Sequence, residues 1–215
     1  MSVAHPTPHP IPAEERERLV GLALRIVEER GGQGLTMNEL AARAGLSSAH
    51  LSRFFESKDA LLEAIAEQWF RPKVAIMDEV MASGLSARRK MFEFFARRFV
   101  RLRETYYADP AAFQMYVEIG AEHFELVRSY VDLGDHYLGE IIGEAMGEGY
   151  FAGLGVDEAI SLVNQMCTLY VNMGAMPMVM DRLSEDKLAR IIDAVFDGLS
   201  AQDRGAKSVS GLRAV

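Results

Sequence analysis

The sequence contains one cysteine, no long apolar run and no recognisable N-terminal signal. Among its 215 residues, Cys167 is the single cysteine and cannot form an internal disulfide. The apolar runs are too short to span a bilayer, and the N-terminus lacks the basic and apolar segments of a secretory signal. We therefore expect a cytoplasmic protein without a membrane partner. Cys167 lies among apolar neighbours, which favours packing over a redox role.

An excess of positive charge is also absent. The formal net charge is −8, and residues 1–70 hold seven Lys and Arg against ten Asp and Glu. A nucleic-acid-binding domain usually has a basic face, so any such binding here must depend on a few local cations. Arg43, Arg53 and Lys58 are the candidates, because only one acid occurs from residue 43 through residue 58. A second basic run at residues 88–103 is interpreted as a solvated helix face.

Residues 36–55 have the pattern of two short helices joined by a glycine turn, with start and stop signals for each. Thr36 can cap the first helix by accepting a hydrogen bond from the amide three residues later. Gly45 follows that helix and is free to take the left-handed conformation that ends it. Ser47 can cap the second helix. The pattern predicts a helix-turn-helix.

The outer face of the second helix carries side chains that can contact DNA. Hydroxyl, imidazole and guanidinium groups on such a face can reach base edges in a major groove. Lys58 begins a third helix, where a cation is unfavourable for the helix dipole but suits a nearby phosphate. The sequence therefore predicts a DNA-binding domain. The residues of the outer face are Ser48, Ala49, His50, Ser52 and Arg53.

A longer pattern surrounds this motif and consists of Thr36, Ala44-Gly45-Leu46-Ser47, Leu51, Phe54-Phe55 and Ser57-Lys58-Asp59-Ala60-Leu61. With it, residues 13–70 resemble the N-terminal domain of TetR-family transcriptional regulators. The resemblance implies that Thr36 and Lys58 hold the phosphate backbone and that residues 47–53 form the recognition surface. Ser52 stands where the family commonly has a tyrosine, and Arg53 is the candidate to replace its phosphate contact. The DNA-binding candidates are Thr36, Ser47, Ser48, Ala49, His50, Ser52, Arg53, Phe54 and Lys58.

The rest of the chain continues at helical spacing, with no strand pattern. The predicted fold is all-α, with an N-terminal three-helix DNA-binding domain and a C-terminal helical domain for ligand binding and dimerisation. Pro72 is expected to kink or end the long helix after Lys58. The predicted divisions are a flexible tail at 1–12, the DNA-binding domain at 13–70, the helical effector and dimerisation domain at 71–201, and a frayed C-terminus at 202–215.

The last two predicted helices, residues 156–174 and 184–199, carry broad apolar faces. In a monomer these faces would form intramolecular core, whereas the family resemblance implies that they pair with their copies in a homodimer. We favour the homodimer, because two-fold symmetry would also place two copies of the DNA-binding helix on one DNA molecule. The candidate interface residues are Val163, Cys167, Tyr170, Ile192, Val195 and Phe196.

The segment between the DNA-binding domain and these helices is rich in aromatic and methionine side chains. A plain core stripe explains most of them, yet methionine repacks easily and suits an inducible pocket. The resemblance implies a small-molecule effector, for which we expect an apolar or aromatic compound. The candidate ligand residues are Phe99, Tyr116, Phe124, Tyr137, Met166 and Met173.

Two other classes compete with a DNA-binding regulator. A helical-bundle enzyme has its best constellation in Glu118, Glu122, His123, Asp132 and His136, but the Glu-x-x-His pairs of helical di-iron sites do not occur, nor do nucleotide or zinc motifs. A helical interaction module fits the acidic charge but leaves Lys58 unexplained. We therefore expect a non-enzymatic regulator without metal or cofactor, most simply a repressor, whose partners are palindromic double-stranded operator DNA, an effector and a second copy.

Overall fold

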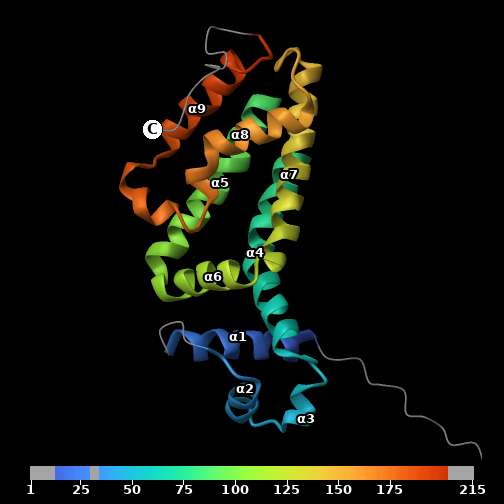
Figure 1. Cartoon of the computed structure of the whole chain (residues 1–215), viewed down its shortest axis with the longest axis vertical. Helices are drawn as coiled ribbons and strands as arrows, with labels where there is room; N and C mark the ends of the chain where they lie inside the picture. Colours follow the sequence, from blue (N-terminus) through green and yellow to red (C-terminus); the bar gives the residue numbers. More distant parts are fainter. Residues whose placement is uncertain (1–12, 30–33, 203–215) are drawn as a thin grey trace, which may run out of the picture. The chain divides into compact units, whose positions relative to one another are not determined.

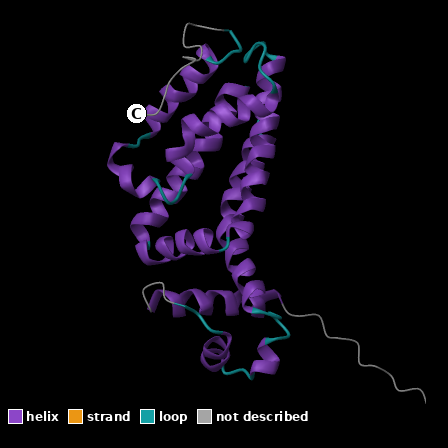
Figure 2. Cartoon of the chain, viewed as in Figure 1, coloured by secondary structure: helices purple, strands orange, loops and turns teal. Residues whose placement is uncertain are grey.

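The structure is a computed structural model that describes residues 13–29 and 34–202. In this part of the chain every regular element is a helix (Figures 1 and 2), which confirms the all-α prediction. The expected tail at 1–12 and most of the expected frayed end lie outside the described residues. The elements are α1 (Ala13–Glu29), α2 (Met37–Ala44), α3 (Ser48–Leu51), α4 (Lys58–Ala82), α5 (Ala87–Ala108), α6 (Pro110–Glu122), α7 (Phe124–Gly147), α8 (Val156–Val171), the 3-10 helix η1 (Met176–Arg182) and α9 (Glu185–Gly198).

The helices form two compact units. The first contains residues up to Pro72 together with 105–130, and the second contains residues 73–104 and those from 131 onward. Residues 105–130 belong to the first unit because α6 packs on α1, as Figure 1 shows. The sequence-based division at 13–70 and 71–201 concerns the roles of the two parts, and it remains a prediction.

The core of the first unit joins the four N-terminal helices. Leu19 of α1, Leu40 of α2, Leu51 of α3 and Leu61 of α4 are almost fully buried in one apolar cluster. Burying such a side chain contributes about 1.5–3 kcal/mol to the free energy of unfolding. Met115 of α6 lies in the same cluster, so α6 is part of the support of the DNA-binding motif.

Local signals fix where the helices begin and end. The side chains of Asp109 and Ser184 accept hydrogen bonds from the Ala112 and Lys187 amides at 2.9 and 3.3 Å, and so cap α6 and α9. Pro72 does not end α4, which runs through it to Ala82. The boundary between the two units falls directly after this proline, where one helical hydrogen bond is missing.

The second unit has an aromatic and aliphatic core of its own. Phe95 and Phe99 of α5, Ile142 of α7 and Val163 of α8 are fully buried in it. The ring of Phe99 meets that of Tyr170 edge to face, with 5.1 Å between centroids. Several helices thus bury their apolar faces against one another within a single chain.

Candidate nucleic-acid interface

The turn between α2 and α3 has the geometry of a helix-turn-helix. The Thr36 hydroxyl accepts a hydrogen bond from the Glu39 amide at 3.3 Å and caps α2. Gly45 then takes the left-handed conformation, with φ 69° and ψ 26°, and the Leu46 amide donates to the Ala41 carbonyl at 2.9 Å. A residue with a β-carbon is strained at such a φ, so glycine is the residue that ends α2 well.

The recognition segment begins with a capped but very short helix. The Ser47 hydroxyl accepts from the His50 amide at 3.2 Å, and α3 spans four residues from Ser48 to Leu51. Winding continues past α3, because the Phe55 amide still donates to the Leu51 carbonyl at 3.1 Å. Leu51 and Phe55 are buried, and they anchor the middle and the end of the segment to the core.

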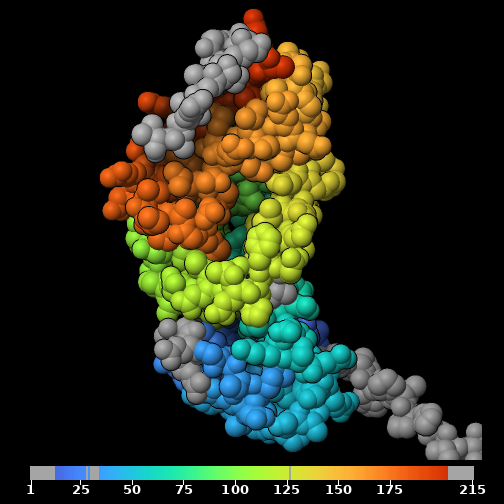
Figure 3. Space-filling view, in the orientation of Figure 1, coloured from blue at the N-terminus to red at the C-terminus, as the bar shows by residue number. Residues whose placement is uncertain are grey.

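The side chains predicted to read DNA lie together on an exposed face. Ser48, Ala49, His50, Ser52 and Arg53 are all exposed. Figure 3 shows the α2 and α3 segment, in light blue and cyan, at an open surface of the first unit. Such a face is accessible to a major groove.

Phe54 has a different environment from the other candidates. It is half-buried and packs against the core of the first unit. Its ring also stacks with the His50 ring, with 5.8 Å between centroids and 11° between planes. Phe54 therefore supports the orientation of His50 from below the exposed face.

The three cations proposed for this region are not equivalent. The Arg43 guanidinium pairs with the Glu29 carboxylate at 2.6 Å, so its charge is already compensated. Arg53 and Lys58 are exposed, and neither forms an ion pair with any residue that the structure describes. Lys58 stands at the first position of α4, after Ser57, whose hydroxyl accepts from the Ala60 amide at 3.1 Å. Two cations with unpaired charge thus flank the recognition segment.

Comparison with known families agrees with this geometry. Residues 19–65 match the family described as bacterial regulatory proteins, tetR family, and residues 87–192 match the family described as tetracyclin repressor-like, C-terminal domain. The chain belongs to the TetR family of transcriptional regulators. The two matches cover both the helix-turn-helix and most of the helices that follow, and they confirm the resemblance seen in the sequence.

Individual proteins similar to this TetR-family chain share either a short segment of sequence or the fold at low sequence identity. An uncharacterised HTH-type transcriptional regulator of Xanthobacter autotrophicus is 36% identical over 63 residues, which are 29% of this chain and 31% of that protein. The matched segment thus spans about a third of this relative. Two solved structures share the fold. They are the fatty acid degradation regulator FadR of Bacillus halodurans, with 17% identity, 90% and 98% coverage of the two chains and a TM-score of 0.59, and a transcriptional regulator described as putative from Pseudomonas aeruginosa, with 20% identity, 87% and 91% coverage and a TM-score of 0.63.

The six side chains proposed to surround an effector are divided between the two units. In the first unit, Tyr116 stacks on Trp69 with 3.8 Å between ring centroids, and Phe124 is 60% exposed. In the second, Phe99 is buried and the Tyr137 hydroxyl hydrogen-bonds the Asp78 carboxylate. Met166 is exposed and Met173 half-buried. Composition marked this region as rich in adaptable side chains, but it could not tell which of them share one space.

The six side chains proposed for the dimer interface are all buried within one chain. Their own neighbours in the second unit already cover them, so a partner chain would have to meet other side chains of α8 and α9. Helical periodicity identifies an apolar face, but it does not tell whether the same chain or a second copy covers that face. The six are Val163, Cys167, Tyr170, Ile192, Val195 and Phe196.

The basic run of α5 is mostly neutralised within the second unit, and Lys90 and Arg98 are buried. Its interpretation as a solvated face therefore needs correction at these two positions, because the periodicity of α5 turns both of them toward the core. Most of its charges pair with acids of the same unit. The pairs are Arg88 with Asp193 and Asp197, Arg89 and Arg97 with Glu93, Lys90 with Glu144, and Arg103 with Glu185.

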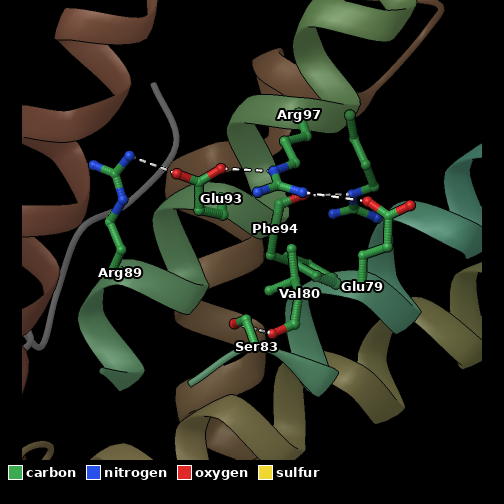
Figure 4. A network of polar contacts seen from close by, with 8 residues as sticks. Glu79, Val80, Ser83, Arg89, Glu93, Phe94 and Arg97 are labelled. Carbon is green, nitrogen blue, oxygen red and sulfur yellow. Dashed lines mark hydrogen bonds and ion pairs between the residues drawn. The ribbon is translucent and has the colours of Figure 1, made fainter. Parts of the chain in front are cut away.

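A groove of about 520 Å³ runs along α5 in the second unit. Figure 4 shows its charged edge, where Arg89, Glu93, Arg97 and Glu79 form a line of ion pairs with N–O distances of 2.5, 2.7 and 3.4 Å. The charges of Glu93 and Arg97 are thus already paired. The lining contains none of the six proposed effector residues and consists of Ile76, Phe92, Glu93, Ala96, Arg97, Val100, Arg101, Glu104 and Glu185.

Other kinds of site find little support in the described part of the chain. No three His, Cys, Asp or Glu side chains there gather closely enough to hold a metal ion. In the constellation considered for an enzyme, His136 instead lies 3.5 Å from the Glu140 carboxylate. None of the described helices combines the length and apolar character that crossing a membrane requires.

Sequence reasoning missed three buried cations, Lys73, Lys90 and Arg98. Arg98 follows Met91 by seven residues and Phe94 by four, so it stands within the apolar stripe of α5. Lys73 precedes the buried Met77 by four residues on α4. Charge alone suggested solvent exposure for all three, whereas helical spacing from their apolar neighbours was the signal that could have found them.

Proposed function

We propose that this TetR-family regulator is a homodimeric repressor that binds a palindromic operator and releases it when a small molecule binds. The observation that carries the proposal is the exposed recognition face beside two cations, Arg53 and Lys58, without an ion-pair partner among the described residues. Compensated charges contribute little to DNA affinity, whereas such exposed cations can replace counterions on phosphates.

The residues of this face fall into two groups, those suited to phosphate oxygens and those suited to base edges. Lys58 and the Thr36 hydroxyl, at two helix N-termini, suit phosphate oxygens. His50 projects from the recognition segment and suits base edges, with Ser48 beside it. Ser52 is not a free donor, because its hydroxyl donates to the Ser48 carbonyl at 2.9 Å. Arg53 is therefore the stronger candidate for the contact that the family commonly makes through tyrosine.

For the dimer we propose the outward side of α8 in place of the buried one. Leu162, Met166, Leu169 and Met173 follow one another at helical spacing, and Met166 and Leu169 are 43% and 42% exposed. No Asp, Glu, Lys or Arg occurs from residue 159 to residue 180. An exposed apolar stripe in an uncharged segment supports self-association through a two-fold contact.

The dimer face is tested by Met166→Glu, with Val131→Glu as a control of similar exposure in the same unit. A carboxylate buried in a dimer contact costs several kcal/mol, so Met166→Glu should sediment as a monomer and lose operator affinity. Val131→Glu should remain dimeric. If both variants stay dimeric at micromolar concentration, the interface lies elsewhere.

Selection of bound sequences from a random DNA pool tests DNA binding and symmetry together. The expected result is an inverted repeat, because each protomer of a two-fold dimer presents the same recognition face. Recovery of no enriched sequence would reject the proposed function and favour a helical interaction module or an enzyme. His50→Ala should cost about 1–3 kcal/mol and relax the preference at a symmetric pair of positions, whereas Arg53→Ala should weaken binding to all sequences alike.

The phosphate role of Lys58 is tested by the salt dependence of operator affinity. Lys58→Ala removes two phosphate contacts from a dimer and should lower the slope of log K against log salt by about two. Lys187→Ala removes an exposed lysine from the second unit and should leave the slope unchanged. An unaltered slope for Lys58→Ala would exclude a phosphate contact.

The regulatory step has a natural reporter in Trp69, the only tryptophan of the chain. Its ring stacks on Tyr116 of α6, and α6 packs on α1 within the first unit. We propose that effector binding shifts α6 and thereby the recognition helices that α1 supports. An effector that releases DNA should then change Trp69 fluorescence, whereas release with unchanged fluorescence would argue against this route.

A further inference from the structure

One side chain of the second unit places a positive charge in the middle of the helix bundle. Arg98 of α5 is 7% exposed. Its Nη1 lies 3.9 Å from the Met77 sulfur of α4, and a β-carbon added at Gly134 of α7 would lie 3.6 Å from the same nitrogen. Its charge also acts on the buried Cys167 thiol of α8. Parts of α4, α5 and α7 therefore lie against this guanidinium.

The surroundings of Arg98 compensate its charge only in part. Its Nε donates to the Phe94 carbonyl at 3.0 Å, and the guanidinium lies 3.9 Å from the centroid of the Phe94 ring. Among the residues that the structure describes, no carboxylate pairs with it. The contrast with Lys90 is direct, because that buried cation of the same helix has the Glu144 carboxylate at 2.7 Å. A guanidinium has five N–H donors, and most of those of Arg98 have no anionic acceptor.

A second basic side chain lies in the same interior. Lys73 of α4 is 5% exposed, one helical turn before Met77. Burial, together with the charges of Arg101 and Arg98, lowers the pKa of its ammonium to about 6. Two basic groups therefore share an apolar region, and an anion beside the guanidinium of Arg98 is favoured there.

The same helices leave space at the surface. Figure 3 shows the second unit hollowed between α7 and α8, with parts of α4 and α5 at the floor of the hollow. The side chains beside Arg98 are apolar, since Met77, Phe94 and Phe95 are all buried around it. A ligand that reached Arg98 from this hollow would need an apolar part and one anionic group.

We propose that the effector is an apolar monocarboxylate whose carboxylate forms a bidentate pair with Arg98 and whose hydrocarbon part lies in the hollow between α7 and α8. This inference rests on the proposed ligand-responsive function and specifies its chemistry. A single guanidinium fork matches the two oxygens of a carboxylate, and its strength rises in an apolar environment. The carboxylate thus supplies the counter-charge that Glu144 supplies for Lys90.

The test compares straight-chain carboxylates from hexanoate to palmitate, and 4-phenylbutyrate, each with its primary alcohol of equal length. Calorimetric titration of the full-length protein should show at least one acid that binds about tenfold or more tightly than its alcohol, since hydrogen bonds between two charged groups are stronger than those to a neutral hydroxyl. Arg98→Met should abolish this preference. Arg97→Met, the neighbouring exposed arginine, should preserve it. Equal binding of acids and alcohols to the wild-type protein, or an acid preference that survives in Arg98→Met, would overturn the proposal.

A second measurement uses the wild-type protein, so that its result does not depend on correct folding of Arg98→Met. The carboxyl carbon of a bound, 13C-labelled acid should titrate well below the pKa of the free acid, because an adjacent guanidinium favours the ionised form. Titration at or above the free value would place the carboxyl in an apolar site and reject the pairing. Operator affinity measured with and without the acid tests the regulatory function separately. An acid that binds through Arg98 but does not change operator affinity would support the binding site and contradict only the proposed ligand response.

Discussion

Lys73 provides a stability test that needs neither DNA nor ligand. Because burial and two nearby arginines lower its pKa from 10.5 to about 6, the ammonium must lose its proton when the chain folds at pH 7. Each pH unit between pH 7 and the ordinary pKa of 10.5 corresponds to about 1.4 kcal/mol, so this deprotonation costs on the order of 5 kcal/mol at neutral pH. Lys73→Met keeps the length of the side chain and removes that cost. We expect the variant to be more stable at pH 7 by about 1–5 kcal/mol, where the range allows for water penetration and lost contacts.

The sign of the pH dependence follows from the depressed pKa. Between pH 6 and 10.5 the unfolded chain holds a proton on Lys73 that the folded chain lacks. The free energy of unfolding of the wild-type protein should therefore rise with pH relative to Lys73→Met, by up to about 1.4 kcal/mol per unit between pH 7 and 9. Below pH 6 both states bind the proton, and the difference between the two proteins should become constant.

Urea unfolding followed by circular dichroism at several pH values measures this difference directly. Lys58→Met is the matched control, because Lys58 is exposed and its substitution should leave the pH dependence unchanged. Parallel pH profiles for the wild-type protein and Lys73→Met would mean that Lys73 stays protonated in the folded state, and the reasoning from burial would then be refuted. Such a result would also imply a fully charged interior beside Arg98.

Three further predictions concern single positions. Gly45→Ala should lower the free energy of unfolding by about 1 kcal/mol or more, because φ is 69° there, and thermal unfolding that matches the wild type would contradict the strain. Arg43→Ala should leave the salt slope of operator binding unchanged, since Glu29 already compensates its charge, and a reduced slope would show that the pair opens on DNA. Cys167 should resist thiol reagents at pH 8 in the folded state, because burial raises its pKa to about 12, and rapid labelling without unfolding would show that its site is open to solvent.

The helix-turn-helix of the first unit, from Thr36 to Phe55, was predictable because the sequence signals that define it are local. The caps at Thr36 and Ser47 and the left-handed Gly45 appear in the structure where the sequence placed them. Each depends on residues within a few positions of one another, so no tertiary contact is needed to infer it. The contribution of Met115 to the core of this unit was not predictable, because α6 joins it from far along the chain.

The assignment of surfaces in the second unit lay beyond the sequence. Periodicity marked the apolar faces of α8 and α9, yet a face such as that of Val163 is covered by the same chain. The outward stripe that includes Met166 is apolar as well, so periodicity alone does not tell which of the two faces is buried. For Arg98, helical spacing could have indicated a buried position but not its neighbours, since Met77 and Gly134 lie on helices that are distant in sequence.

The distribution of charge explains how an acidic protein can carry a DNA-binding head. The net charge of −8 sets a repulsive long-range field toward DNA, so affinity must come from short-range contacts. Most cations of α5 are held by acids of the second unit, and Arg43 is held by Glu29. Among the described residues around the recognition segment, Arg53 and Lys58 are therefore the cations able to meet phosphates. With two such contacts per protomer a monomer would bind weakly, and in the proposed homodimer their doubling would make operator binding dependent on dimer geometry. A change in that geometry can then release DNA with little differential binding energy from the effector, since a tenfold loss of affinity requires about 1.4 kcal/mol.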